Sequence, residues 1–152
     1  MILYRVGKTS HANDLTGEGA RLHGGRWNHI LIPCIYASES RALAVLEYTV
    51  NVNIDDIARS ISLTTFEVPG INVQKIKIAD LPGNWIEIPA PTSTKDFGTK
   101  LLKGLTSPVI KIPSAIIPQE FNYLLNPLHA DRIHFNIISI QDFVYDVRIK
   151  LV

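Results

Sequence analysis

Residues 17–50 read GEGARLHGGRWNHILIPCIYASESRALAVLEYTV, and the rest of the chain is organised around this stretch. A glycine-rich turn with two arginines comes first, a short apolar strand follows, and an apolar helix over about residues 39–51 ends it. A Gly-Gly pair lets the backbone adopt conformations closed to other residues and leaves room for a ligand to approach the main chain. The pattern predicts a strand and a helix that meet beside a polar turn.

The predicted helix carries one acidic residue at an apolar position. With Ser38 or Ser40 as the cap, four residues share one face at i, i+3, i+4 and i+7, namely Leu43, Leu46, Glu47 and Val50. We therefore expect Glu47 to point into the protein, where a carboxylate needs a partner or a chemical role. Two interpretations stay open, a buried ion pair with an arginine and a catalytic carboxylate.

The two arginines of the turn suit a phosphate group. Arg26 directly follows Gly24 and Gly25, and Arg21 lies five residues upstream. A guanidinium fork matches two phosphate oxygens at once. The turn is not a Walker loop, because no Gly-Lys-Ser/Thr follows it, and the chain contains no Gly-x-Gly-x-x-Gly dinucleotide motif.

Length and composition indicate one globular domain spanning residues 1–152. Hydrophobic residues make up 46% and charged residues 19%, which is an ordinary globular balance with enough apolar material for a core. The net charge of +1 argues against a broad nucleic-acid surface, which normally shows a clear basic excess.

A lone cysteine and the absence of targeting patterns favour the cytoplasm. Cys34 has no partner for an internal disulfide and sits in an apolar run, so we expect a small core residue in a reducing compartment. The first residues lack a signal-peptide pattern, and no apolar run approaches membrane-spanning length. The histidines at 11, 23 and 29 show no metal-ligand spacing, so no metal site is predicted.

The remaining chain predicts short strands and few helices. We expect strands at 2–6, 34–37, 60–68, near 73–78, and at 109–112, 132–140 and 143–151. A turn of helix is expected in 53–59, and a second long helix from Ser93 or Thr94 to Lys103, stopped by Gly104. Strands without regular strand–helix alternation indicate an α+β fold.

Four other expectations concern loops and single residues. Residues 8–29 read as a long polar connection, and 122–127 as a turn in which Asn122 and Asn126 satisfy backbone groups. Trp85 is expected to anchor the core, and Asp146 with Arg148 to form a structural ion pair.

A series of short motifs resembles the RES domain family. In order they are YRV at 4–6, GEGAR at 17–21, GGRWN at 24–28, IYAS at 35–38 and ALAVLE at 42–47, and they continue as IPSA at 112–115, NYLLNP at 122–127 and YDVR at 145–148. The resemblance covers nearly the whole chain. It implies an ADP-ribosyltransferase-like α+β fold, with two small packed β-sheets around a cleft and helices at the flanks. It also implies the toxin of a bacterial toxin–antitoxin pair that consumes NAD+.

The resemblance assigns roles in cleavage of the nicotinamide–ribose bond, which passes through an oxocarbenium-like transition state. Glu47 would bond a ribose hydroxyl and stabilise the developing positive charge, and Tyr36 would fix the nicotinamide ring. Arg26 would hold the diphosphate, assisted by Arg21 or Arg5. The remaining residues expected at the NAD+ pocket are Tyr4, Gly25 and Ser114.

The acceptor of the ADP-ribosyl group stays open. Water makes the protein an NAD+ glycohydrolase, phosphate makes it a phosphorolase, and a protein side chain makes it a mono-ADP-ribosyltransferase; we rank degradation of NAD+ first and transfer second. A catalytically silent nucleotide-binding module is a further alternative. The resemblance also implies an Xre-type helix-turn-helix antitoxin as partner and allows a homodimer within that complex.

Two departures from the family pattern bear on the site. His29-Ile30-Leu31-Ile32 stands where the family often has proline and glycine, and Asn51 stands where it often has histidine. Both concern loop geometry and efficiency more than the type of reaction.

Overall fold

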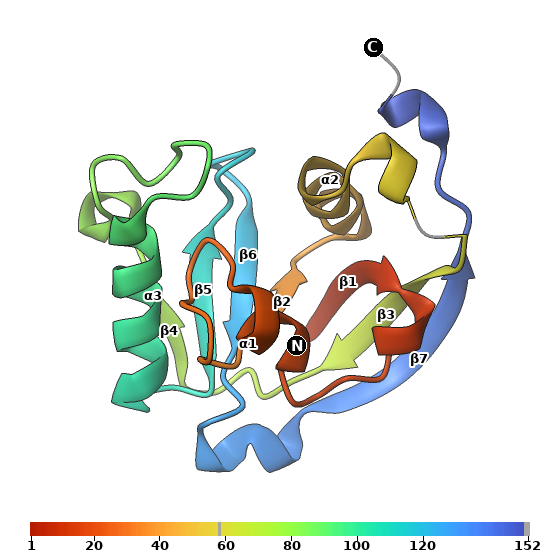
Figure 1. Cartoon of the computed structure of the whole chain (residues 1–152). Coiled ribbons are helices and arrows are strands. Elements are labelled where there is room, and N and C mark those ends of the chain that lie inside the picture. The colour runs from red at the N-terminus through yellow and green to blue at the C-terminus, as the bar shows by residue number, and fades with distance from the viewer. Residues whose placement is uncertain (58, 151–152) are drawn as a thin grey trace.

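The computed structural model describes residues 1–57 and 59–150 and contains a single seven-stranded sheet (Figure 1). The strands are β1 (Ile2–Lys8), β2 (Ile35–Ser38), β3 (Ile61–Glu67), β4 (Val73–Lys75), β5 (Val109–Pro113), β6 (Phe121–Leu125) and β7 (Asn136–Phe143). Their order across the sheet is β4-β5-β6-β2-β1-β3-β7, and only the β4–β5 pair is parallel. The α-helices are α1 (Glu18–His23), α2 (Arg41–Asn51) and α3 (Thr92–Gly104).

The sheet consists of two halves that meet at one residue pair. Strand β1 pairs with β3 over residues 2–8, but its pairing with β2 is confined to Tyr4 opposite Ser38. Figure 1 shows the β4-β5-β6-β2 half and the β1-β3-β7 half turned away from one another, with α3 beside the first half and α2 above the second. The expected α+β class is confirmed, and the two expected sheets are linked edge to edge through this pair.

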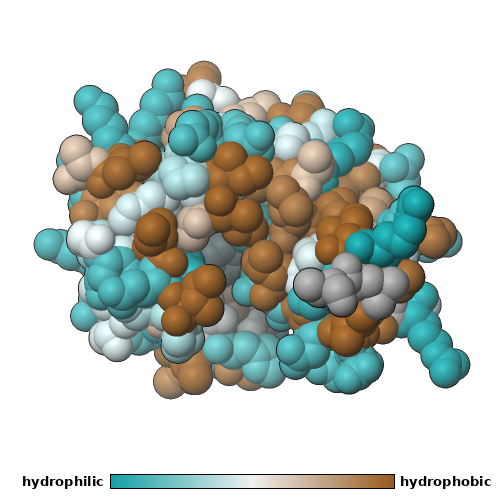
Figure 2. Space-filling model, turned by 90° about the horizontal axis from the view of Figure 1, so that it is seen from above, coloured by the Kyte–Doolittle hydropathy of each residue, from teal (hydrophilic) through white to brown (hydrophobic). Residues whose placement is uncertain are grey.

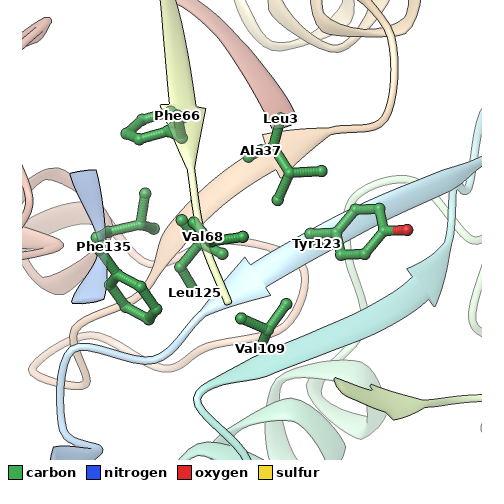
Figure 3. Packing of buried hydrophobic residues seen from close by; sticks show 9 residues of the cluster. Leu3, Ala37, Phe66, Val68, Val109, Tyr123, Leu125 and Phe135 are labelled. Atoms are coloured by element: carbon green, nitrogen blue, oxygen red, sulfur yellow. The ribbon is translucent and has the colours of Figure 1, made fainter. Parts of the chain in front are cut away.

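Three apolar clusters hold the halves and helices together. One includes Leu3, Phe66 and Leu125 and lies where β1, β3 and β6 approach one another (Figure 3). A second packs α3 on β5 and β6 and contains Trp27 and Trp85, so the expected core position of Trp85 is confirmed. The third holds α2 on the other half of the sheet through Val6, Ala44, Ile61, Leu63 and Tyr145. Removal of this apolar surface from water is the main stabilising term for such a fold.

Helix α2 begins as the sequence predicts. The Ser40 hydroxyl caps it by accepting a hydrogen bond from the Leu43 N–H at 3.0 Å. Leu43 is fully buried, but Val50 is 56% exposed, so the prediction of a uniformly inward face was wrong at its C-terminal end. There the Lys150 ammonium donates hydrogen bonds to the carbonyls of Thr49 and Val52. A cation at this end satisfies carbonyls that have no partner within a helix.

Several predicted elements differ in the structure. The connection over 8–29 contains α1, and residues 121–125 form the inner strand β6 in place of the expected turn. Residues 132–134 belong to a 3-10 turn ahead of β7, which then extends to Phe143. The expected strand 143–151 was wrong, because residues 147–149 form a 3-10 turn; position 151 lies outside the described residues. The expected ion pair between Asp146 and Arg148 is confirmed at 2.7 Å.

The helix predictions need smaller corrections. Helix α3 starts at Thr92 and includes Gly104, and the left-handed residue that ends it is Leu105, with φ of 55°. A 3-10 turn at 54–56 matches the expected helical turn within 53–59, of which position 58 lies outside the described residues. In the part of the chain that the structure describes, no helix is long and apolar enough to cross a membrane.

Candidate active site

A pair of hydrogen bonds fixes the carboxylate of Glu47. The Ser114 hydroxyl, after β5, donates to Glu47 Oε1 at 2.9 Å, and the Asn122 amide on β6 donates to the same oxygen at 2.5 Å. Within residues 1–57 and 59–150, no hydrogen bond or ion pair reaches Oε2. The carboxylate is therefore held through one oxygen and keeps the other for a ligand.

The two donors are themselves oriented by neighbours. The Ser114 oxygen accepts hydrogen bonds from the N–H groups of Ile116 and Ile117 at 3.1 and 3.3 Å, which leaves its hydrogen for Glu47. The Ser38 hydroxyl donates to the Asn122 carbonyl oxygen at 2.7 Å, which turns the amide hydrogens toward Glu47. The carboxylate thus sits in a network whose donors have only one arrangement that satisfies all members.

The ion pair expected as one interpretation of Glu47 is not what the structure shows. Among the described residues, no arginine or lysine lies within ion-pair distance of its carboxylate. Neutral donors from Ser114 and Asn122 take that place. Because no basic group pairs with it at close range in the described structure, the carboxylate of Glu47 stays available to a positively charged group that enters from outside.

Glu47 lines a cleft of about 240 Å³, which we call the Glu47 cleft. Its walls come from β1, β2, α2 and β6 and include Tyr4, Arg5, Val6, Tyr36, Ala44, Glu47, Tyr48 and Asn122. Three tyrosine side chains in so small a space give flat apolar surfaces with polar tips, which suit an aromatic ligand that carries polar groups. Asn51 also lines the cleft, and its amide donates to the Glu47 backbone carbonyl at 2.8 Å.

Tyr36 is locked by the glycine-rich turn. Its hydroxyl accepts a hydrogen bond from the Trp27 N–H at 3.0 Å and donates to the Asn28 side-chain oxygen at 2.6 Å. A Cβ on Gly25 would lie 2.6 Å from that hydroxyl, so glycine is needed here by Tyr36 itself. Burial raises the pKa of Tyr36 well above its usual value, which keeps the phenol protonated. The hydroxyl is thus occupied by the protein, and the ring is the part offered to a ligand.

Asn28 organises the turn from within. It is fully buried, and its amide donates to the carbonyls of Ala20 and Ile32 at 2.8 and 2.9 Å. The atypical segment after it packs on α3, where the His29 ring contacts Asp96 at 2.6 Å and the His29 backbone N–H donates to the Thr99 hydroxyl at 3.0 Å. The departure at His29 therefore has its own anchor on α3 and leaves the contacts of Tyr36 intact.

The three candidate arginines have different settings. Arg26 uses Nη1 to donate to the carbonyls of Trp85 and Glu87, each at 2.9 Å, and burial lowers its pKa while the charge of Glu47 opposes that shift. Arg21 is partly exposed and pairs with Glu18 at 2.6 Å. Arg5 is among the residues that line the Glu47 cleft.

Arg5 also lines a second cleft of about 210 Å³, which we call the Asp14 cleft. Arg5 and Tyr36 are common to both clefts, so the two spaces adjoin at these residues. Arg5 Nη2 donates to the carbonyls of His11 and Ala12 at 3.1 and 3.4 Å, and burial lowers its pKa while Asp14 opposes that shift. The Asp14 cleft adds further polar side chains, namely Lys8, His11, Asp14 and Thr64.

The structure brings most of the candidate residues together. Glu47, Tyr36, Tyr4 and Arg5 line the Glu47 cleft, and Ser114 contacts Glu47 directly. The charge of Glu47 affects the pKa of Arg26, so these two side chains lie near one another. Gly25 leaves room for the Tyr36 hydroxyl, and Arg21 forms an ion pair with Glu18.

Sequence reasoning missed two residues of the site. The expectation that Asn122 satisfies backbone groups was wrong, because its amide binds Glu47; that expectation is confirmed for Asn126, whose amide donates to the Leu102 carbonyl at 2.9 Å. Tyr48 lines the cleft beside Glu47 and was not singled out. Its position next to Glu47 in the sequence could have suggested Tyr48. Adjacent residues of a helix point about 100° apart, however, so this position alone does not predict that the two share a site.

Cys34 is a core residue, as expected. It is 2% exposed, and burial raises the pKa of its thiol above the usual value, so the reactive thiolate is disfavoured. Within the described residues, no group of three or more histidine, cysteine, aspartate and glutamate side chains is arranged to hold a metal ion.

Comparisons with known proteins agree over nearly the full chain. The family model of the RES domain matches residues 2–146. "Toxin Res" of Yersinia enterocolitica is 36% identical over 153 residues, covering 99% of this chain and 100% of the relative. "Prs ADP-ribosylating toxin" of Sphingobium sp. is 34% identical over 144 residues, covering 93% of this chain and 89% of the relative.

A solved structure shares the fold. The crystal structure of the M. tuberculosis MbcT–MbcA toxin–antitoxin complex matches with a TM-score of 0.69 over 94% of this chain and 84% of that chain, at 19% identity. The fold that the resemblance implied is therefore confirmed, and the family match rests on the sequence comparisons. The chain belongs to the RES domain family.

Proposed function

We propose that this protein is a toxin that cleaves NAD+ at the nicotinamide–ribose bond. The observation that carries the proposal is the carboxylate of Glu47, bound through one oxygen by Ser114 and Asn122 in a cleft lined by tyrosines and Arg5. The names of its RES relatives as toxins, one of them ADP-ribosylating, support the same conclusion.

The chemistry needs little from the protein. The bond between ribose C1′ and the pyridinium nitrogen breaks, its electron pair goes to that nitrogen, and nicotinamide leaves as a neutral molecule. Positive charge develops on the ribose ring, as in glycoside hydrolysis. A fixed carboxylate beside the ribose stabilises this charge and accepts a hydrogen bond from a ribose hydroxyl, which is the role we give Glu47.

The cationic side chains would bind the diphosphate. Arg5 stands in the wall shared by the two clefts, and Arg26 lies near Tyr36 and Glu47 with one of its nitrogens held by backbone carbonyls. We assign both to the phosphate oxygens, Arg5 by direct contact. Arg21, bound to Glu18 on the exposed α1, would assist only by leaving that ion pair. Tyr4, Tyr36 and Gly25 would shape the pocket around the nicotinamide and its ribose.

Water or phosphate is our first choice of acceptor. Attack of water on C1′ forms the new C–O bond and releases ADP-ribose and a proton; phosphate gives ADP-ribose 1″-phosphate. Transfer to a protein side chain is the second candidate, and the name of the Sphingobium relative favours it. A silent nucleotide-binding module would bind NAD+ without releasing nicotinamide.

An antitoxin is the proposed protein partner, as in the complex described for MbcT and MbcA. Residues 86–92 and 114–120 lie on the same side of the molecule as α2 in Figure 1, and their exposed side chains include Ile86, Ile88 and Ile116. From above, Figure 2 shows apolar side chains on both sides of a hollow in this face. Such a rim suits a partner that covers the cleft. We propose an Xre-type helix-turn-helix protein for this role.

The decisive experiment measures NAD+ consumption and nicotinamide release by purified protein beside Glu47→Gln. Glutamine keeps an oxygen for Ser114 and Asn122 but carries no charge, so the fold is expected to persist while the rate falls by about 10² to 10³. Labelled ADP-ribose retained on protein would select transfer over degradation. No nicotinamide release by wild-type protein at high concentration, with NAD+ and candidate acceptor proteins present, would reject the proposal.

A further inference from the structure

The Asp14 cleft contains a glycine at a place where a side chain would fit. Gly7, inside strand β1, lines this cleft, and a Cβ on Gly7 would meet no atom within 4 Å. The backbone does not require glycine here either, because the described glycines with positive φ are Gly17 and Gly24. A glycine inside a strand weakens the strand, and one use of such a residue is the close approach of a ligand.

The open side of Gly7 is the side of the Asp14 cleft. Successive side chains of a strand point to opposite faces, so a Cβ on Gly7 would share the face of Arg5. Thr64 pairs with Arg5 across β1 and β3 and lines the same cleft. The Thr64 hydroxyl and the Arg5 guanidinium both donate to the Ala12 carbonyl, at 3.0 and 3.4 Å, so the loop after β1 is held over this face.

Other glycines of this region have a reason within the fold. A Cβ on Gly17 would lie 2.7 Å from the Cys34 nitrogen, and one on Gly25 would lie 2.6 Å from the Tyr36 hydroxyl. Gly7 has no such neighbour. The space beside it is therefore room that the described chain leaves open.

Neither cleft alone has room for a dinucleotide. Pockets for drug-sized ligands have volumes of about 300–1,000 Å³. The Glu47 cleft and the Asp14 cleft have volumes of about 240 and 210 Å³, and they adjoin at Arg5 and Tyr36. With the nicotinamide ribose at Glu47 and the diphosphate at Arg5, the rest of the substrate continues toward the Asp14 cleft.

We propose that the Asp14 cleft binds the adenosine end of NAD+, with the adenine ring lying against the backbone at Gly7. A missing side chain lets a flat base approach the main chain. Lys8, His11 and Asp14 line the same cleft at exposed or half-buried positions and offer hydrogen-bonding groups for a sugar and a base. The inference rests on the proposed function, because the roles of Glu47 and Arg5 set the direction of the substrate.

The test fills the open space with Gly7→Val and uses ADP as the probe, because ADP carries the adenosine and the diphosphate without nicotinamide. Valine favours strands and its Cβ would meet no atom within 4 Å, so we expect a Tm equal to or above the wild-type value. The Kd for ADP, measured by calorimetry, is expected to rise about ten- to a hundredfold because the ligand is crowded. The Kd for nicotinamide is expected to stay unchanged.

Gly70→Val is the matched control, since a Cβ there also meets no atom within 4 Å and Gly70 lines neither cleft. It should leave both dissociation constants unchanged. Gly7→Ala should weaken ADP binding in the same direction but less. Unchanged ADP binding in folded Gly7→Val would overturn the proposal, as would an equal loss of nicotinamide binding. A marked fall in Tm in both Gly7 variants would also overturn it, because the fold would then require the glycine.

A competition titration with wild-type protein needs no variant. Because ADP and nicotinamide are assigned to different clefts, saturation with nicotinamide should leave the Kd for ADP unchanged. Exclusion of ADP by nicotinamide, or no binding of ADP at all, would reject the inference.

The same measurements separate this inference from the proposed function. If wild-type protein binds ADP and Gly7→Val weakens that binding, but NAD+ stays intact, the proposed function fails alone. If NAD+ is cleaved while Gly7→Val changes neither ADP binding nor the KM for NAD+, the inference fails alone.

Discussion

Asn122 on β6 donates a hydrogen bond to Glu47 on α2 at 2.5 Å, although the two residues are 75 positions apart. The contact joins β6, an inner strand of one half of the sheet, to α2, the helix that packs on the other half. The amide is turned toward Glu47 by Ser38, which donates to its carbonyl oxygen at 2.7 Å. The orientation of the candidate catalytic carboxylate therefore depends on a residue of a distant strand.

Asn122→Ala is expected to reduce kcat about tenfold with little change in KM, because Glu47 loses a donor that orients it for the transition state. The free energy of unfolding should fall by about 1–3 kcal/mol, since Ser38 also loses its acceptor. Steady-state nicotinamide release and urea unfolding measure the two effects. Ser114→Ala is the matched variant, because it removes the other donor to Oε1. If KM rises and kcat stays constant in both, the two donors bind substrate instead of orienting Glu47.

Gly25→Ala is expected to displace the Tyr36 ring, because the new Cβ would lie 2.6 Å from its hydroxyl and 2.9 Å from the Asn28 oxygen. We expect a loss of about 1–3 kcal/mol in stability and a clear fall in NAD+ cleavage. Thermal unfolding and nicotinamide release measure both. Gly70→Ala, where a Cβ would meet nothing within 4 Å, is the control and should change neither. Equal behaviour of the two variants would show that the turn adapts freely.

Gly98→Ala should be among the most destabilising single substitutions in α3. A Cβ there would lie 2.0 Å from the Trp27 carbonyl oxygen, so the helix would have to move away from the turn. The cost is about 3 kcal/mol or more. Gly104→Ala, near the end of the same helix, has only Thr106 at 3.9 Å and should be neutral or stabilising by up to about 0.5 kcal/mol. Chemical unfolding of both variants tests the expected opposite signs.

Asp14 is expected to contribute stability that depends on pH. Burial raises its pKa, but hydrogen bonds from the Thr16 hydroxyl and from the N–H groups of Thr16 and Glu18 outweigh this, so the folded-state pKa lies below 3.8. A carboxylate with a lowered folded-state pKa stabilises above its unfolded-state pKa, and the contribution is lost as pH falls through the folded-state value.

Asp14→Ala should therefore lower the free energy of unfolding by about 1 kcal/mol at pH 7, with the difference from wild type shrinking below about pH 3.8. Urea midpoints measured from pH 7 down to pH 3 test this. A difference that stays constant over that range would mean that the side chain acts through its shape instead of its charge.

The sequence predicted best those elements whose defining contacts lie within the element itself. The serine cap, the apolar period and the acid of α2 are all within the helix, and Ser40 caps it as expected. Apolar runs between turn residues likewise gave β1, β3 and β5 to within a few residues. The family resemblance then directed attention to Glu47 and Tyr36, which line one cleft in the structure.

The failures have a common physical cause in long-range contacts. Strand β6 reads as a turn because asparagine and proline favour turns, but Asn122 is satisfied by Glu47 and Ser38, which a local reading does not see. The ion-pair interpretation of Glu47 failed for the same reason, since its partners, Ser114 and Asn122, lie more than 60 positions away along the chain. Tyr48 was missed because only the packing of α2 on the sheet places it in the wall of the cleft.

The single pairing of Tyr4 with Ser38 between the two halves of the sheet has a mechanical consequence. A joint of one residue pair restrains relative rotation of the halves less than a full ladder would, so this restraint falls to the shared apolar cluster of Leu3, Phe66 and Leu125 and to the hydrogen bonds of Glu47. Tyr4 and Ser38 both line the Glu47 cleft, so rotation about this joint changes the width of the cleft directly. The width of the site therefore depends on a few contacts between the halves, which a bound nucleotide or a docked protein can alter without unfolding either half.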